Sequence, residues 1–136
     1  MKYLDTNIII YAIENHAKYG KKCKKILQDI QDNKLKTCSN ILVLVEVINV
    51  LTKLNKTLEI KLDIAENINA ILNLPIEWYE LSFPIIKHAS NYNFKVSGVD
   101  YIHIATMEIN SIFEVITADK EFNKINFLKR VDPLDY

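Results

Sequence analysis

Short apolar runs alternate along the chain with longer stretches in which apolar residues recur at helical spacing. The short runs have the length of strands, and the stretches between them are long enough for helices. Because strands and helices alternate, the expected fold is α/β: a three-layer sandwich in which helices flank a central, mostly parallel sheet of four to five strands. Strands are predicted at residues 2–5, 34–38, 76–81 and 113–117, and an edge strand at 127–131.

Helical spacing and helix-capping residues place the helices between these strands. Ser39, Ser82 and Ser97 each stand where an N-cap is expected. The isoleucines at positions 8–10 suit a strand as well as a helix, so residues 8–14 keep both interpretations. Helices are predicted at residues 8–14, 16–32, 41–54 and 57–74, after Ser82, from Ser97 to about residue 110, and at 119–124.

The predicted helix at residues 57–74, which Pro75 ends, carries more apolar surface than packing on one core face requires. Its apolar residues form two adjacent stripes instead of one. The surplus surface predicts contact with a partner helix or a homodimer. The stripe residues are Leu58, Ile60, Leu62, Ile64, Ile68 and Ile71.

Length and composition indicate one globular domain, residues 1–136, because 49% of the residues are apolar. The 17 basic and 17 acidic side chains cancel, which argues against binding nucleic acid through net charge. Two glycines are too few for a P-loop or a dinucleotide-binding loop. No apolar run is long enough to span a bilayer, and Asp5 interrupts the region where a signal peptide is apolar, so a soluble, cytoplasmic protein is expected.

Three aspartates stand where the catalytic site of an α/β protein would need them. Asp5 and Asp119 lie at the ends of predicted strands, and Asp100 opens a predicted helix. Each has an ordinary alternative role as a helix cap or as part of a capping box. The carboxyl ends of parallel strands meet at one edge of a sheet, however, where these side chains can converge.

Glu46 lies in a stretch so apolar that its helix is expected to be buried on nearly every side. Burying a carboxylate costs on the order of several kcal/mol of folding free energy, unless the carboxylate is paired with a cation or binds a metal. The alternatives are therefore a salt bridge with a lysine or arginine and a metal ligand. Arginine is the usual partner of a buried carboxylate, and the chain has only Arg130, near its end, so the metal ligand is favoured.

Asp5, Glu46, Asp100 and Asp119 are therefore candidate catalytic and metal-binding residues. Carboxylates without histidine or cysteine partners suit Mg²⁺ or Mn²⁺. Such ions promote phosphodiester hydrolysis by activating water and stabilising charge on the leaving oxygen. These residues predict the chemistry and leave the substrate open.

At four places the sequence resembles the PIN-domain ribonucleases, particularly the small VapC-type toxins of toxin–antitoxin pairs. Residues 4–7, Leu-Asp-Thr-Asn, are similar to the first motif of the family, and Glu46, in an apolar helix after Ser39, is similar to the second. Residues 100–105, Asp-Tyr-Ile-His-Ile-Ala, resemble the third motif, and residues 117–122, Thr-Ala-Asp-Lys-Glu-Phe, resemble the fourth. The order and spacing of these motifs extend over the whole chain.

The resemblance implies a PIN fold, metal-dependent cleavage of RNA and an antitoxin protein as partner. Many members of the family carry a further acid near the fourth motif, where this chain has only Glu121. A weak or absent second metal site is therefore expected.

Polar neighbours of the acids are candidates for supporting roles. Thr6, Asn7 and Thr117 are expected to orient Asp5, Asp119 or a bound water, although local turn hydrogen bonds are the alternative. Two basic residues close to the acids, Lys95 and Lys120, are candidate phosphate contacts. His103, three residues after Asp100, is interpreted as a core histidine in preference to a ligand or proton shuttle.

The expected function is that of a metal-dependent endoribonuclease, the toxin of a type II toxin–antitoxin pair. The alternatives are a PIN-like nuclease of RNA maturation or structured DNA, a non-catalytic binding module of the same fold, and a protein phosphorylated on an aspartate. The motifs describe a metal site and not a substrate groove, so they do not separate the two nucleases. Glu46 on an apolar helix disfavours the last two alternatives.

Overall fold

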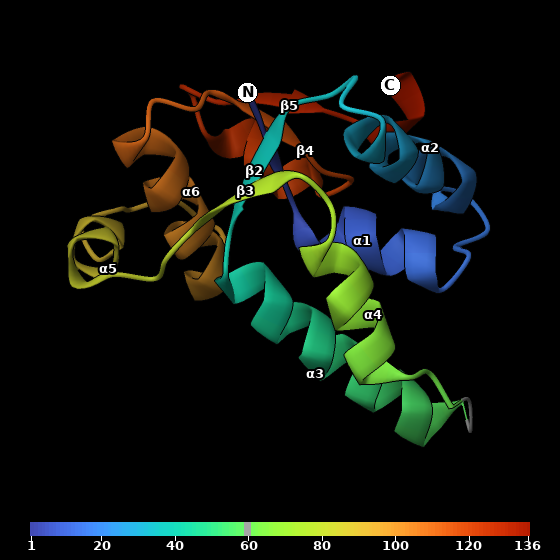
Figure 1. Cartoon of the computed structure of the whole chain (residues 1–136). Coiled ribbons are helices and arrows are strands. Elements are labelled where there is room, and N and C mark those ends of the chain that lie inside the picture. The colour runs from blue at the N-terminus through green and yellow to red at the C-terminus, as the bar shows by residue number, and fades with distance from the viewer. Residues whose placement is uncertain (59–60) are drawn as a thin grey trace.

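Five short strands form one sheet, in which every neighbouring pair is parallel. The computed structural model describes residues 1–58 and 61–136 (Figure 1). The strand order is β3-β2-β1-β4-β5, so β5 is an edge strand, as expected. The strands are β1 (Lys2–Leu4), β2 (Thr37–Asn40), β3 (Ile76–Tyr79), β4 (Glu114–Ile116) and β5 (Lys129–Val131).

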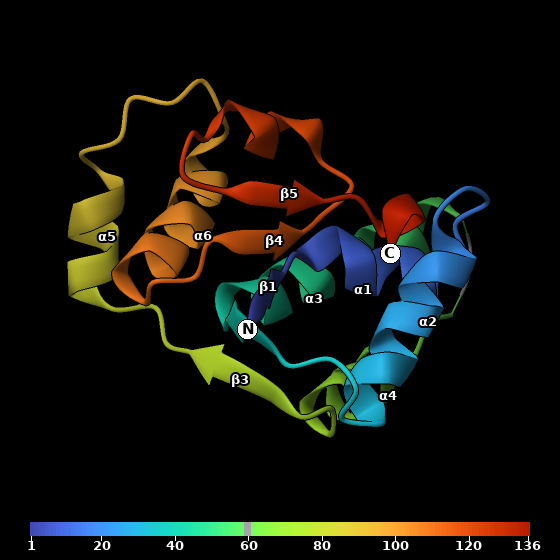
Figure 2. The same ribbon diagram turned by 90° about the horizontal axis from the view of Figure 1, so that it is seen from above.

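Helices lie on both sides of the sheet, which confirms the expected three-layer α/β fold. Figure 1 and Figure 2 show α1 and α2 on one side and α5 and α6 on the other. Figure 1 shows α3 and α4 side by side, extending away from the sheet. The helices are α1 (Thr6–Ile13), α2 (Gly20–Gln31), α3 (Leu42–Thr57), α4 (Ile64–Leu72), α5 (Phe83–Ala89) and α6 (Gly98–Ile109), with 3₁₀ helices η1 (Lys120–Lys124) and η2 (Pro133–Asp135).

Successive strand residues point to opposite sides of the sheet and divide the core in two. Leu4 and Ile116 pack in the core that includes α1, α2 and α3. Tyr3 and Val115 pack in the other core, with Ile104 of α6. Because β1 and β4 are parallel neighbours, their carboxyl ends lie side by side, and the residues that follow them are brought together.

The single helix predicted at residues 57–74 is wrong. α3 ends at Thr57, and α4 begins only after Asp63, whose side chain caps it. The Asn55 side chain donates to the Leu62 carbonyl at 3.0 Å and accepts from the Leu62 N–H at 2.8 Å. This paired contact ties the segment just before α4 to the last part of α3, and helical spacing does not reveal such a side-chain contact. Residues 59 and 60 of the prediction lie outside the described residues.

The apolar stripe predicted on that helix is used mainly inside the chain. Four of its residues pack against the core, one is exposed, and one lies outside the described residues. The stripe therefore stays a predicted partner surface only in its exposed part. The packed residues are Leu62, Ile64, Ile68 and Ile71, and the exposed residue is Leu58. Ile60 is the one outside the described residues.

α3 is not buried on nearly every side, contrary to expectation. Val43 and Val47 are fully buried, whereas Val45 and Ile48 are 53% and 42% exposed. Glu46 is only half-buried as a result. The apolar sequence was misleading because α3 extends past the sheet, where only part of its surface has a packing partner (Figure 1).

Ser39 does not cap α3, although Ser82 and Ser97 cap α5 and α6 as predicted. β2 begins and ends later than predicted and so includes Ser39, whose hydroxyl donates to the Leu4 carbonyl at 2.9 Å. The Asn40 side chain instead accepts a hydrogen bond from the first backbone N–H of α3, at 2.9 Å.

The structure also determines where α1 and α2 begin, which the sequence left open or placed wrongly. Residues 6–13 are helical, which settles the open interpretation of residues 8–14. α2 begins at Gly20 and not near residue 16, because His16 Nδ1 accepts hydrogen bonds from the backbone N–H groups of Lys18 and Tyr19 at 3.1 and 3.2 Å. Among the described residues, no helix combines the length and apolar character needed to cross a membrane.

Candidate functional site

The four predicted acids line one cavity of about 240 Å³ at the carboxyl ends of β1 and β4. Asp5 directly follows β1, and Asp119 comes three residues after the end of β4. Glu46 lies on α3, and Asp100 lies in the first turn of α6. The other lining residues are Thr6, Asn7, Ile10, Tyr11 and Val50.

Asp5 is held by hydrogen bonds at both carboxylate oxygens. It is 7% exposed and serves as the N-cap of α1, with Oδ1 accepting from Thr6 N at 2.7 Å. Oδ2 accepts from Asn7 Nδ2 at 2.9 Å and from Thr117 Oγ1 at 2.6 Å. The capping role and a role in the site are therefore compatible, because the cap fixes the carboxylate inside the cavity.

Thr117 and Asn7 join the ends of β1 and β4. Asn7 Nδ2 also donates to Thr117 Oγ1 at 2.9 Å, and Asn7 Oδ1 accepts from the Ala118 N–H at 3.2 Å. Thr117 Oγ1 accepts from Asp119 N at 3.0 Å, while Asp119 Oδ1 accepts from the N–H of Glu121 at 2.9 Å. These two side chains therefore fix the backbone on which Asp119 is mounted.

Glu46 is joined to α1 and to α6. Its Oε1 accepts from Thr6 Oγ1 at 2.9 Å and lies 2.6 Å from His103 Nε2. The partner of Glu46 is thus neither of the two residue types considered from the sequence, lysine or arginine, but His103, which is fully buried. The only sequence signal was the spacing of His103 from Asp100, which places both on one face of α6.

The cavity concentrates negative charge. Burial raises the pKa of Asp5 and the Glu46 charge adds to this, although His103 and hydrogen bonds oppose it. Burial also raises the pKa of Asp100, with further contributions from the charges of Asp5 and Asp119. Among the described residues that line the cavity, none is a lysine or an arginine. The acids therefore lack a cationic side chain of that kind to balance them within the cavity.

His103 responds to the same charges in the opposite direction. Burial lowers the pKa of His103, but the hydrogen bond with Glu46 and the charges of Asp5, Glu46 and Asp100 outweigh it, so that the pKa is raised. The acids around it therefore favour the protonated form of the imidazole.

The donor set fits a hard cation. All four acids supply oxygen ligands, and Asp5 is already fixed in position by hydrogen bonds. The excess of negative charge favours a divalent cation, and oxygen ligands suit Mg²⁺ or Mn²⁺. In the described part of the chain, no three acidic, histidine or cysteine side chains stand close enough to share an ion as they are oriented. The carboxylates would therefore have to move closer together to share an ion, and Glu46 Oε2 accepts no hydrogen bond among the described residues.

Three other predicted residues lie outside the cavity. Lys95 and Lys120 are exposed and are not part of its lining. Glu121 forms an ion pair with Lys124 and likewise does not line it. The fourth motif therefore contributes Asp119 alone to the cavity wall.

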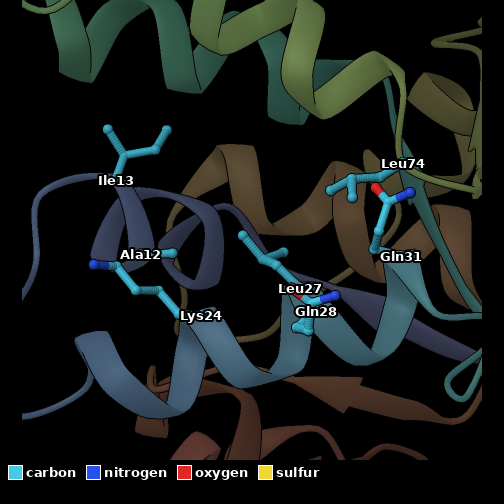
Figure 3. A pocket seen from close by; sticks show the side chains of 7 residues that line it. All are labelled: Ala12, Ile13, Lys24, Leu27, Gln28, Gln31 and Leu74. Carbon is cyan, nitrogen blue, oxygen red and sulfur yellow. The ribbon is translucent and has the colours of Figure 1, made fainter.

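A larger cavity of about 440 Å³ carries different chemistry. It lies between α1, α2 and the segment before β3, and Figure 3 shows the side chains of Ile13, Leu27 and Leu74 at its wall. No acidic residue lines it among the described residues. The smaller, acidic cavity is therefore the candidate catalytic site, although it is not the largest.

An ion pair behind the cavity supports the position of Thr117. Arg130 Nη1 donates to the Thr117 carbonyl at 2.9 Å and to Asp132 Oδ2 at 3.0 Å, and Asp132 Oδ1 accepts from Leu134 N at 3.0 Å. Burial alone would raise the pKa of Asp132, but these bonds and the Arg130 charge outweigh it and lower the pKa.

Asp132→Asn is expected to destabilise the fold by about 1–3 kcal/mol at pH 7, because it leaves Arg130 without its partner. A lowered native pKa means that the stability is present above the unfolded pKa of about 3.9 and is lost as the pH falls through the native value. Urea unfolding of both proteins from pH 7 down to pH 3 measures this. A difference between the two proteins that does not shrink with falling pH would contradict the prediction.

Residues 2–128 match the family model of the PIN domain. A comparison with curated protein sequences found no match. Among solved structures, the chain is similar to a toxin–antitoxin complex from Klebsiella pneumoniae, with 20% identity, 98% coverage of each chain and a TM-score of 0.67.

Two further structures are similar over nearly their whole length. VapBC2 from Rickettsia felis, bound to a DNA fragment from its promoter, has 18% identity, a TM-score of 0.67 and coverage of 96% of this chain and 98% of that one. FitAcB from Neisseria gonorrhoeae has 16% identity, a TM-score of 0.55 and full coverage of both chains. At these identities the likeness establishes the fold and nothing finer.

Proposed function

The chain belongs to the PIN-domain family, and on this premise we propose that it is a metal-dependent endoribonuclease, which hydrolyses RNA phosphodiester bonds with Mg²⁺ or Mn²⁺. We propose further that it is a VapC-type toxin of a type II toxin–antitoxin pair, acting in the cytoplasm. The observation that carries the proposal is the convergence of Asp5, Glu46, Asp100 and Asp119 on one cavity without a lysine or arginine in its described lining.

Asp5, Glu46, Asp100 and Asp119 would hold the ion, which when bound supplies activation of water and stabilisation of the charge on the leaving oxygen. Asp5 is the most firmly positioned of the four, since donors from α1 and from the end of β4 hold both its oxygens. Asn7 and Thr117 act through Asp5 and Asp119 by keeping the ends of β1 and β4 together. Water adds across the P–O bond, so that one product carries a phosphate and the other a hydroxyl.

Lys95 and Lys120 are proposed to contact RNA phosphates outside the cavity. Both are exposed, and Lys120 is the residue next to Asp119 on the chain. The acidic cavity repels the phosphate groups of an RNA backbone. Basic side chains near the cavity would therefore favour RNA binding. Their contribution would appear in the affinity for RNA more than in the rate of the chemical step.

The substrate class is tested with purified protein and four nucleic acids: single-stranded and structured RNA, and single-stranded and flap-containing DNA, each with Mn²⁺. The proposal expects internal cleavage of RNA alone. Cleavage of the DNA substrates would favour the alternative nuclease, and binding without cleavage of any substrate would favour a non-catalytic module of the same fold.

An antitoxin protein and a second copy of the chain are the proposed partners. The antitoxin is supported by the names of the similar structures, one of which is described as a toxin–antitoxin complex. The homodimer is supported by an exposed apolar surface around α5. Phe83 is 88% exposed there, with Ile86 and Leu81 beside it also exposed. Clusters of this kind on soluble proteins commonly mark contact surfaces.

Phe83→Ser is expected to lower the mass in solution from that of a dimer toward that of a monomer, because it removes the most exposed apolar side chain of this surface. Light scattering over a range of concentrations measures the mass. Leu58→Ser is the matched comparison on the other predicted surface. If only Leu58→Ser lowers the mass, the second copy binds at α3 and α4 instead.

A further inference from the structure

His103 connects the candidate site to the backbone of the sheet. It is fully buried on α6, between Glu46 of α3 and Tyr3 of β1. His103 Nε2 lies 2.6 Å from Glu46 Oε1, and His103 Nδ1 lies 2.6 Å from the Tyr3 hydroxyl. The two ring nitrogens are thus both engaged, on opposite sides of the ring.

Asn40 fixes the direction of one hydrogen bond of Tyr3. The Asn40 N–H at the end of β2 donates to the Tyr3 hydroxyl oxygen at 3.1 Å, and a backbone amide can only donate. When the imidazole is neutral, the hydroxyl proton of Tyr3 is available for His103 Nδ1. A neutral imidazole that accepts at Nδ1 carries its proton on Nε2, which donates to Glu46. The N–H directed at Glu46 is also present when the ring is protonated, so the contact persists in both forms.

Glu46 needs this support more than the other acids. It is mounted on a helix that is partly exposed, and its side chain has three rotatable bonds whose freedom must be lost before it can bind an ion in a fixed place. Thr6 and His103 both donate to Oε1, whereas Oε2 accepts no hydrogen bond among the described residues. One oxygen is therefore anchored and the other is left available.

We propose that Tyr3 and His103 are positioning residues, which hold Glu46 so that its outer oxygen can bind the metal ion. The inference rests on the proposed function, since it assigns Glu46 to that site. Tyr3 sets the orientation of the imidazole, and the imidazole sets the orientation of the carboxylate. Partners of this kind behind a metal ligand commonly contribute about 10- to 100-fold in metal affinity.

A second cluster of the same residue types provides a matched control. Glu108 on α6 binds His88 and Tyr92, but Glu108, unlike Glu46, does not line the acidic cavity. The side chains of His88 and Glu108 are also much more exposed than that of His103. Substitutions in this cluster remove similar hydrogen bonds without reaching Glu46.

Mn²⁺ binding to the metal-free protein, followed by the paramagnetic resonance signal of free Mn²⁺, tests the proposal. Tyr3→Phe and His103→Asn should each weaken binding about tenfold or more, because the first releases the ring and the second cannot reach Glu46. His103→Gln, whose amide can reach near the position of Nε2, should recover much of the affinity. Tyr92→Phe and His88→Asn should bind as the wild type does.

The nitrogen resonances of His103 provide a second measurement that needs no metal. Nitrogen NMR of the folded wild type, assigned with His103→Gln, should show Nε2 protonated, and Tyr3→Phe should alter the Nδ1 resonance. An unprotonated Nε2, or unchanged Mn²⁺ affinity in folded Tyr3→Phe and His103→Asn, would overturn the inference while leaving the proposed function intact. Absence of Mn²⁺ binding by the wild type would overturn both.

Discussion

Asp5→Asn is expected to reduce RNA cleavage by at least about 10³-fold while the fold survives. The substitution removes the charge of the acid that the chain holds most firmly, with hydrogen bonds at both oxygens. The side-chain oxygen of the new asparagine can still cap α1, but its amide nitrogen must then face Asn7 Nδ2, which is itself a donor. The cost in stability should stay within about 1–2 kcal/mol, since a buried charge is removed at the same time.

Asp63→Asn is the matched control for this prediction. Asp63 is the N-cap of α4, as Asp5 is of α1, but it is exposed and lies outside the cavity. The same chemical change should therefore leave cleavage unaltered. Rates are measured on one RNA at saturating Mn²⁺, with circular dichroism to verify folding. Asp5→Asn that cleaves within a few-fold of the wild type would remove Asp5 from the site.

Asp100→Asn is expected to change stability in opposite directions with and without metal. In EDTA its melting temperature should exceed that of the wild type by about a few degrees, because the acid is crowded by burial and by the charges of Asp5 and Asp119. In millimolar Mn²⁺ the order should reverse, since binding to the folded state stabilises the wild type by about 2.7 kcal/mol at 100 times the dissociation constant. The variant gains less because one ligand is missing.

The pH dependence of this effect has a definite sign. A raised native pKa of Asp100 means that the folded protein holds the proton more tightly than the unfolded chain does. The stability of the metal-free wild type should therefore fall as the pH rises from the unfolded value of about 3.9 through the native value, and Asp100→Asn should lack this part of the loss.

Glu66→Gln is the control, because Glu66 occupies the same position in α4 as Asp100 does in α6. In both helices the N-cap side chain accepts a hydrogen bond from the N–H of this residue. Glu66 is exposed and lies outside the cavity, so its neutralisation should give no rise in EDTA and no loss of response to Mn²⁺. Scanning calorimetry provides the comparison, and an Asp100→Asn variant less stable than wild type in EDTA would contradict the repulsion argument.

The parallel sheet and the meeting of the acids could be predicted because both depend on local features of the sequence. Short apolar runs between amphipathic stretches are sufficient to predict parallel strands. Once the strands are parallel, residues that end neighbouring strands, such as Asp5 and Asp119, must come together. The position of Asp100 at the start of a helix could be predicted because Ser97 is the N-cap of that helix, as the structure confirms.

The remaining features depend on specific side-chain contacts and on packing, which hydrophobic spacing does not show. The break between α3 and α4 requires Asn55 to bond with Leu62, which helical spacing cannot indicate. The partner of Glu46 is His103, which is 57 positions away and comes into reach only when α3 and α6 pack at the same end of the sheet. An apolar sequence also does not indicate how much of a helix extends beyond the sheet, and for that reason Glu46 was expected to be more buried than it is.

RNA cleavage by the wild-type protein in EDTA, followed by return of the metal, is the most direct test of a carboxylate site that works through a divalent ion. No cleavage above background is expected in excess EDTA, and cleavage should return when Mg²⁺ or Mn²⁺ is added beyond the chelator. The Asp5→Asn protein, prepared in parallel, should stay inactive after the metal is returned, which excludes a contaminating nuclease. Full cleavage by the wild type in excess EDTA would contradict the metal-dependent mechanism and the role assigned to the four acids.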